Sequence, residues 1–109
     1  MIKAKHVLVA AALSLIPATP STARSQEFFK GKTVTFVVGY SPGGIFDVYT
    51  RTIARHITKH IPGNPAALVD NMPGAGGAIA ANHIYNRVKP DGLTVGTWAA
   101  PLALQQVMG

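Results

Sequence analysis

Two glycine-rich turns contain the residues of this chain that could bind an anion. The first turn covers residues 41–47, with the sequence SPGGIFD, and the second covers residues 71–77, with the sequence NMPGAGG. Each turn follows a strand-like run and precedes a helix-like run. Glycines let the backbone approach a ligand closely, and the first N–H groups of a helix have no intrahelical partner. Such turns are suited to bind a carboxylate or a phosphate.

Each turn also has a simpler structural interpretation. Ser41-Pro42-Gly43-Gly44 is explained equally well as a tight turn that needs glycine dihedral angles. Asp47 could accept a hydrogen bond from a ligand, but capping and orienting the helix start is the simpler role for it. Two turns on one rim would favour a binding site over two unrelated turns.

Neither turn matches a nucleotide-binding motif. Residues 74–79 resemble a dinucleotide fingerprint, but Ile79 occupies the position of the third glycine, and the turn follows the second strand of the unit. A Walker phosphate loop requires Gly-Lys-Ser or Gly-Lys-Thr after the glycines, and neither is present. We therefore predict no nucleotide cofactor.

Metal binding and catalysis find little support in the side chains. His56 and His60 have the spacing of zinc-protease histidines on one predicted helix, but no glutamate follows His56 and no third ligand is evident. Solvated histidines near the carboxyl end of a helix are the simpler account. Ser41 lacks a recognisable base and orienting group. Tyr40 and Trp98 could flank a ligand, although filling the core is the default role of such aromatics.

The elements that must position these turns alternate between strand and helix. β-branched and aromatic residues at 33–40 predict a strand covered on both faces, as in a parallel sheet. Shorter strands are predicted at 66–70 and 93–97. Residues 25–31 are interpreted as a short lead-in to the sheet.

Helices are predicted after each strand. The first shows one apolar stripe between residues 46 and 61, with basic residues on the opposite side, and an alanine-rich run at 78–86 predicts the second. Pro101 marks the start of a third helix. The apolar stripe consists of Phe46, Tyr49, Ile53, Ile57 and Ile61, and the basic residues are Arg51, Arg55 and Lys59.

This order predicts an α/β fold with a parallel sheet. Right-handed crossovers place the first strand between the other two. Both glycine turns then follow the carboxyl ends of strands, where open α/β sheets bind ligands. We therefore expect the two turns to face one rim.

Residues 1–23 have the pattern of a secretory signal peptide. A basic start precedes a short apolar run at 7–16, and the small residues Ser21 and Ala23 predict cleavage after Ala23. The apolar run is too short to span a bilayer comfortably, although an uncleaved anchor is the alternative. We expect a periplasmic protein.

The composition excludes some kinds of chemistry and favours anionic ligands. The chain has no cysteine, so it forms no disulfide and has no thiol chemistry. Ten Lys and Arg stand against four Asp and Glu, a formal net charge of +6, which favours anionic ligands. The basic residues are dispersed and lack interleaved aromatics, so we predict no nucleic-acid partner.

Four segments occur in order along the chain: residues 29–35, residues 38–44 with Asp47, residues 71–77 and residues 89–92. Together they resemble one family, the tripartite tricarboxylate transporter receptors, also called Bug receptors. These periplasmic solute-binding proteins have two α/β domains that capture small carboxylated solutes between lobes and deliver them to a membrane permease. The resemblance covers nearly the whole chain after residue 23.

The resemblance implies a receptor without enzymatic activity, cofactor or metal, with a small carboxylate and the permease subunits as partners. Residues 24–109 would be an incomplete N-terminal lobe of the periplasmic-binding-protein type (type II-like), and we expect a monomer. Ile45 and Phe46 replace a glycine and a small hydroxyl residue of many relatives, and Met72 replaces a frequent arginine. The implied ligand-binding residues are Ser41, Gly43, Gly44, Asp47, Pro73, Gly74, Ala75, Gly76 and Gly77.

Length is a further departure, because family members run to roughly three hundred residues over two lobes, against 109 here. We expect a fragment that cannot close over a ligand and binds carboxylates weakly or not at all. Two alternatives stay open. A non-functional remnant predicts poor folding, and an exported anion-binding enzyme fragment predicts turnover that depends on Ser41, His56 or His60.

Overall fold

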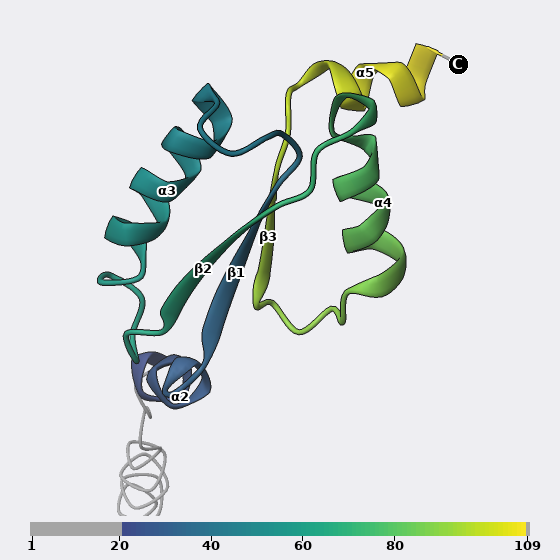
Figure 1. Ribbon diagram of the computed structural model, residues 1–109. Coiled ribbons are helices and arrows are strands. Elements are labelled where there is room, and N and C mark those ends of the chain that lie inside the picture. The colour runs from purple at the N-terminus through teal and green to yellow at the C-terminus, as the bar shows by residue number, and fades with distance from the viewer. Residues whose placement is uncertain (1–20, 109) are drawn as a thin grey trace, which may run out of the picture.

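The computed structural model describes residues 21–108 (Figure 1). Most of the predicted signal peptide, residues 1–20, lies outside this range. The remaining residues of that prediction, 21–23, begin the first described helix. The elements in chain order are α2 (Ser21–Phe29), β1 (Thr33–Val38), α3 (Ile45–Ile57), β2 (Ala66–Asn71), the short 3-10 helix η1 (Ala75–Gly77), α4 (Ala78–Arg87), β3 (Thr94–Thr97) and α5 (Pro101–Met108).

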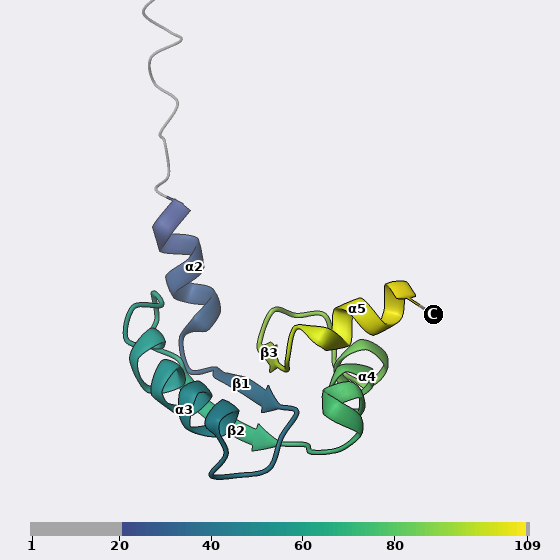
Figure 2. The same ribbon diagram turned by 90° about the horizontal axis from the view of Figure 1, so that it is seen from above.

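The sheet has three parallel strands in the order β2-β1-β3, which confirms the predicted α/β fold and the central place of the first strand. Val38, the last residue of β1, pairs with Asn71 of β2 and with Thr97 of β3. All three strands therefore end at the same rim. Figures 1 and 2 show α3 on one face of the sheet and α4 on the other.

The core is centred on β1. Val34, Phe36, Val37 and Val38 are all at most 5% exposed, so this strand is covered on both faces as its composition predicted. Val34 and Phe36 form one cluster with Ala54 of α3. The partly buried side chains packed against that cluster are Phe29, Val69 and Leu93.

The apolar stripe of α3 is not the face by which this helix packs on the sheet. Its buried residues are Asp47, Thr50 and Ala54, whereas Tyr49 of the stripe is 65% exposed and Ile57 is 43% exposed. Small side chains at Thr50 and Ala54 allow the helix to lie close to β1. Periodicity alone would have selected the more apolar face.

The lead-in to the sheet is helical rather than irregular. Helix α2 includes residues 21–29, and its last residue, Phe29, packs against the core cluster. The α2 backbone packs closely against the turn between α3 and β2. Gly63 in that turn has no Cβ atom, and one added there would lie only 2.6 Å from the carbonyl oxygen of Gln26. Within residues 21–108, the helices are too short or too polar to cross a membrane.

Candidate functional site

The two glycine turns lie side by side at the rim where the strands end (Figure 1). The first turn follows β1 and the second follows β2. The two turns are in contact, because Asn71 at the start of the second donates to Asp47 at the end of the first at 2.9 Å. The end of β1 also contacts the second turn and β3. A Cβ atom on Gly39, just after β1, would be 2.9 Å from the Cα atom of Gly77, and the Gly39 N–H donates to the carbonyl of Thr97, the last residue of β3, at 2.9 Å. The predicted common rim is therefore confirmed.

The carboxylate of Asp47 fixes the shape of the first turn. Asp47 is only 3% exposed, and its Oδ2 accepts the N–H of Gly43 at 2.9 Å. Arg51 Nε lies 3.0 Å from both carboxylate oxygens, and Asn71 Nδ2 donates to Oδ1 at 2.9 Å. Gly44 is the N-cap of α3, and Asp47 in the first turn of the helix reaches back one residue beyond it, to the N–H of Gly43. A capping box has a similar arrangement, but there the N–H of the N-cap itself is the donor.

These contacts keep the Asp47 carboxylate charged. The hydrogen bond from Arg51, the backbone N–H of Gly43 and the Asn71 amide lower the pKa of Asp47 from 3.8 to about 2, against the opposing effect of desolvation. The carboxylate is thus an internal anion with its own donors. This geometry supports the orienting role predicted for Asp47, and its contact with a ligand stays a prediction.

Asn71 and Arg51 are structural members of this site that the sequence analysis did not single out. Asn71 Nδ2 also donates to the carbonyl of Tyr40 at 3.0 Å, and Asn71 Oδ1 accepts from Arg51 Nη2 at 3.0 Å. Asn71 therefore joins the end of β2 to both the first turn and α3. The spacing of four between Asp47 and Arg51 was a usable signal for their ion pair. The Asn71 contacts had no local signal.

The second turn has an unusual backbone. Gly74, Ala75, Gly76 and Gly77 all have positive φ angles, of 136°, 48°, 62° and 97°. Glycine adopts such angles without a Cβ penalty, and successive N–H groups in turns of this kind can form a concave anion site. The helices that follow the turns begin at the N-caps Gly44 and Gly77, and neither has a side-chain cap.

The predicted ligand residues differ in exposure. Gly77 and Asp47 are buried, and Gly74 is half-buried. The other predicted residues form the exposed surface of the two turns, where a ligand could reach their backbone: Ser41, Gly43, Gly44, Pro73, Ala75 and Gly76.

The histidines do not form a metal pair on one helix. Helix α3 ends at Ile57, so His56 is helical and His60 lies in the turn beyond it, which makes the predicted shared helix wrong. His56 Nδ1 lies 2.8 Å from the Thr52 carbonyl oxygen in its own helix. Within residues 21–108, no group of three or more metal-ligating side chains gathers.

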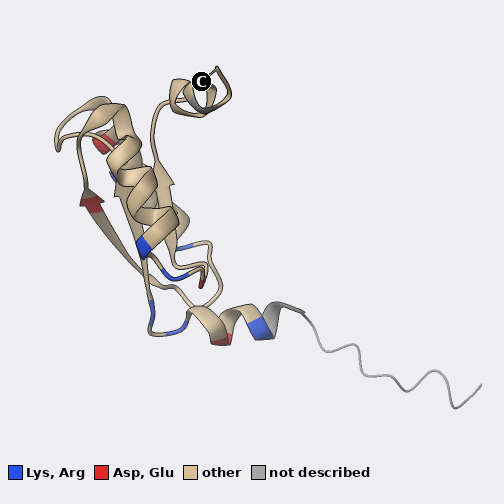
Figure 3. Cartoon of the chain, turned by 90° about the vertical axis from the view of Figure 1, so that its right-hand side faces the viewer, with Lys and Arg blue, Asp and Glu red and all other residues tan. Residues whose placement is uncertain are grey.

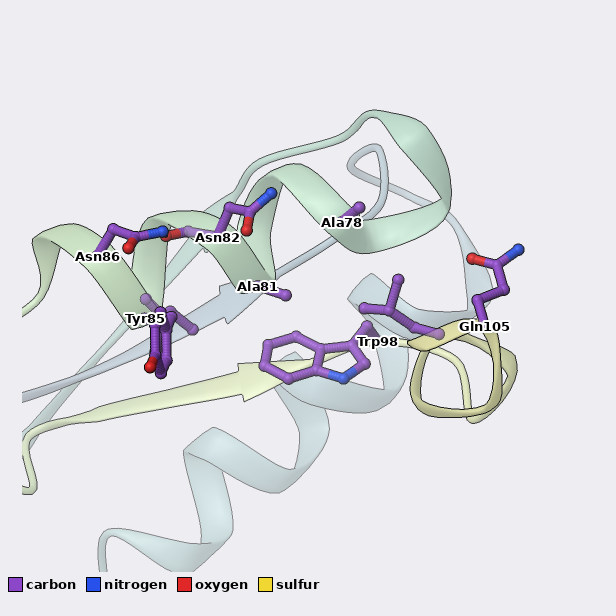
Figure 4. Close-up of a pocket in the computed structure, with 9 residues that line it drawn as sticks. Ala78, Ala81, Asn82, Tyr85, Asn86, Trp98 and Gln105 are labelled. Carbon is purple, nitrogen blue, oxygen red and sulfur yellow. The ribbon is translucent and has the colours of Figure 1, made fainter. Parts of the chain in front are cut away.

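A separate groove of about 800 Å³ lies behind the second turn, between α4 and α5 (Figure 4). Trp98, which follows β3, forms one wall, and Tyr85 and Asn82 of α4 form the other. Trp98 also contacts the second turn, because a Cβ atom on Gly77 would be 2.9 Å from the Trp98 Cβ. Trp98 thus lies between the groove and the second turn and packs against both.

Comparison with known proteins finds similar sequences in proteins that are several times longer than this chain. The chain is similar to the UPF0065 proteins. It is 37% identical over 92 residues to the UPF0065 protein in the gbd 5' region of Cupriavidus necator, and 32% identical over 93 residues to the UPF0065 protein in the tcbD-tcbE intergenic region of Pseudomonas sp. strain P51. Each match covers 84% of this chain but only 27% and 26% of the relative. No protein-family model matches the chain.

A solved structure supports the fold. The chain resembles a structure titled "Structure of a periplasmic transporter" with a TM-score of 0.54 and 32% sequence identity. This match covers 61% of the chain and 21% of the solved protein. The chain therefore spans about a quarter of the curated relatives' length and about a fifth of the solved protein.

Proposed function

We propose that this chain forms part of the first lobe of a periplasmic receptor that binds small carboxylates for a tripartite tricarboxylate transporter. The observation that supports this function best is that two helix N-termini without side-chain caps, after Gly44 and Gly77, share one rim. Free N–H groups at helix starts favour an anion. The similarity to UPF0065 proteins and to a periplasmic transporter agrees with a receptor of this class.

Backbone groups rather than cationic side chains would hold the ligand. Arg51 is already paired with Asp47, and Lys30 and Lys32 lie at the opposite end of β1 from the rim. Figure 3 shows Lys and Arg gathered mainly toward the α2 end of the molecule. The N–H groups of Gly43, Gly44, Gly77 and Ala78 already donate within the chain. A carboxylate at the rim would therefore accept N–H groups from residues 45–46 and 75–76, and no bond of the ligand would be made or broken.

The chain alone would bind weakly under this proposal. In the proposed receptor a ligand lies between two lobes, and this chain supplies one rim of one lobe. A ligand held on one side keeps much of its hydration, so fewer of its oxygens gain protein partners. We expect dissociation constants in the millimolar range for di- and tricarboxylates, with permease subunits needed for delivery but not for binding.

An NMR titration of the chain with succinate and citrate tests this function. We expect amide shifts confined to the two turns and the helix starts, residues 43–46 and 75–78, with Gly43, Gly44, Gly76 and Gly77 among them, and smaller shifts with the neutral diamide succinamide. Shifts scattered over the molecule, or equal shifts with the diamide, would contradict a carboxylate site. A spectrum without dispersed amide signals would instead indicate the non-functional remnant.

A pair of substitutions at Ser41 tests whether the ligand is negatively charged. Ser41 is exposed in the first turn, so Ser41→Asp adds a negative charge there, and Ser41→Asn is the neutral control of similar size. Like charges about 4 Å apart in water repel by about 1 kcal/mol, which weakens binding about fivefold. We expect that loss for Ser41→Asp relative to Ser41→Asn. Equal affinities for the two variants would argue against an anion at this turn.

A further inference from the structure

Tyr40 contacts every segment that forms the rim. Its hydroxyl donates to the Gly76 carbonyl in the second turn at 3.2 Å and accepts the N–H of Ala99, after β3, at 3.3 Å. Its backbone carbonyl accepts from Asn71 at the end of β2. Its ring stacks on Phe46 in the first turn of α3, with centroids 4.5 Å apart and planes at 16°. The side chain of Tyr40 thus links the second turn, the segment after β3 and the start of α3, and its backbone carbonyl adds the end of β2.

The hydroxyl is both a donor and an acceptor in these contacts. A tyrosine hydroxyl has one proton to donate, and here that proton is given to Gly76 while the oxygen accepts from Ala99. The bridged residues are far apart in sequence, because Gly76 is 36 positions after Tyr40 and Ala99 is 59 positions after it. Residues 74–77 follow β2, whereas residue 99 follows β3. Their contact through Tyr40 is therefore a tertiary contact and does not arise from neighbouring positions in the sequence.

From this arrangement we infer that Tyr40 is a positioning residue for the anion site. Its hydroxyl holds the second turn and residues 98–100 against the first turn, so that the N–H groups of both turns face one ligand. The stack with Phe46 keeps the start of α3 in the same arrangement. The consequence for binding rests on the proposed function, whereas the link between the segments does not.

Tyr40→Phe tests the link without a ligand, because it removes the hydroxyl and keeps the ring that stacks on Phe46. Tyr49→Phe is the matched control, since Tyr49 is 65% exposed on α3. Both bonds of the Tyr40 hydroxyl are longer than usual, so we expect the amide hydrogen exchange of Ala99 to rise only about 2- to 5-fold. The exchange of Gly39, which donates to the Thr97 carbonyl, should stay unchanged. Unchanged exchange at Ala99 would overturn the inference.

Succinate titration of the same variants separates positioning from a merely structural role. In Tyr40→Phe, the ligand-induced shifts of Gly76 and Gly77 should fall while those of Gly43 and Gly44 persist, and Tyr49→Phe should match the wild type. Wild-type shifts at Gly76 and Gly77 in Tyr40→Phe would overturn the positioning role. Absence of any succinate shift in the wild-type chain would overturn the proposed function, and the exchange of Ala99 would still decide whether Tyr40 links the segments.

Discussion

Substitution of Gly77 by alanine should destabilise this chain far more than the same substitution one residue earlier. Gly77 is buried at the junction of the second turn and α4, with φ at 97°, and a Cβ atom there would lie 2.9 Å from the Cβ of Trp98. Gly76 has φ at 62°, but a Cβ atom on it would meet nothing within 4 Å. The two positions therefore differ mainly in the overlap with Trp98.

The structure gives the size of the difference. A residue with a Cβ atom at positive φ costs about 1–2 kcal/mol, and Gly77→Ala has the larger share of this cost because its φ of 97° lies outside the left-handed helical region. Forcing an extra methyl group into a packed position costs about 1–3 kcal/mol more, and only Gly77→Ala has this cost. We expect Gly77→Ala to lower the free energy of unfolding by about 2–5 kcal/mol and Gly76→Ala by about 1–2 kcal/mol.

Urea unfolding followed by far-ultraviolet circular dichroism measures both variants against the wild type. A small domain of this kind has little stability to lose, so Gly77→Ala should shift the midpoint strongly or abolish the transition. Equal losses in the two variants would refute the reasoning, because they would mean that Trp98 moves aside at no cost. The result bears directly on whether the second turn is held rigidly at the rim.

Two other predictions concern the polar contacts beneath the first turn. Because the pKa of Asp47 falls from 3.8 to about 2 in the folded chain, its carboxylate contributes stability above about pH 4 that is lost as the pH falls toward 2. Asp47→Asn should therefore flatten the pH dependence of the unfolding midpoint in this window, and an unchanged slope would contradict the assigned contacts. Asn71→Ala removes the side-chain bonds to Tyr40, Asp47 and Arg51 and should lower the unfolding free energy by about 1–3 kcal/mol. Asn86→Ala, on the exposed side of α4, is its control, and an equal loss there would argue against a linking role for Asn71.

The sequence predicted the elements well where local chemistry decides them. The run of β-branched residues at 33–40 predicted a strand, and the strand formed at Thr33–Val38. The glycine turns and Pro101 predicted the starts of the helices that follow them. Helix ends were less well predicted, since α3 stops at Ile57 before the turn that contains His60.

The side chains that hold the rim could not be found in the same way. Tyr40 was open to two interpretations, and its hydroxyl partners became visible only when β1 and β3 were paired. Arg51 was predicted only to lie opposite the apolar stripe of its helix, yet its guanidinium binds Asp47 and Asn71. The Ala99 partner of Tyr40 and the Asn71 partner of Arg51 come from other parts of the fold, which a local pattern does not identify.

The sequence by itself thus determined the alternation of strands and helices, the two glycine turns and their placement at strand ends. These features follow from backbone preferences of neighbouring residues and from the handedness of crossovers. Only the tertiary structure decided that α3 packs by Thr50 and Ala54 rather than by its apolar stripe, and that Tyr40 joins the turns. The physical reason is that close packing and hydrogen bonding depend on distances between segments, and a linear pattern does not contain those distances.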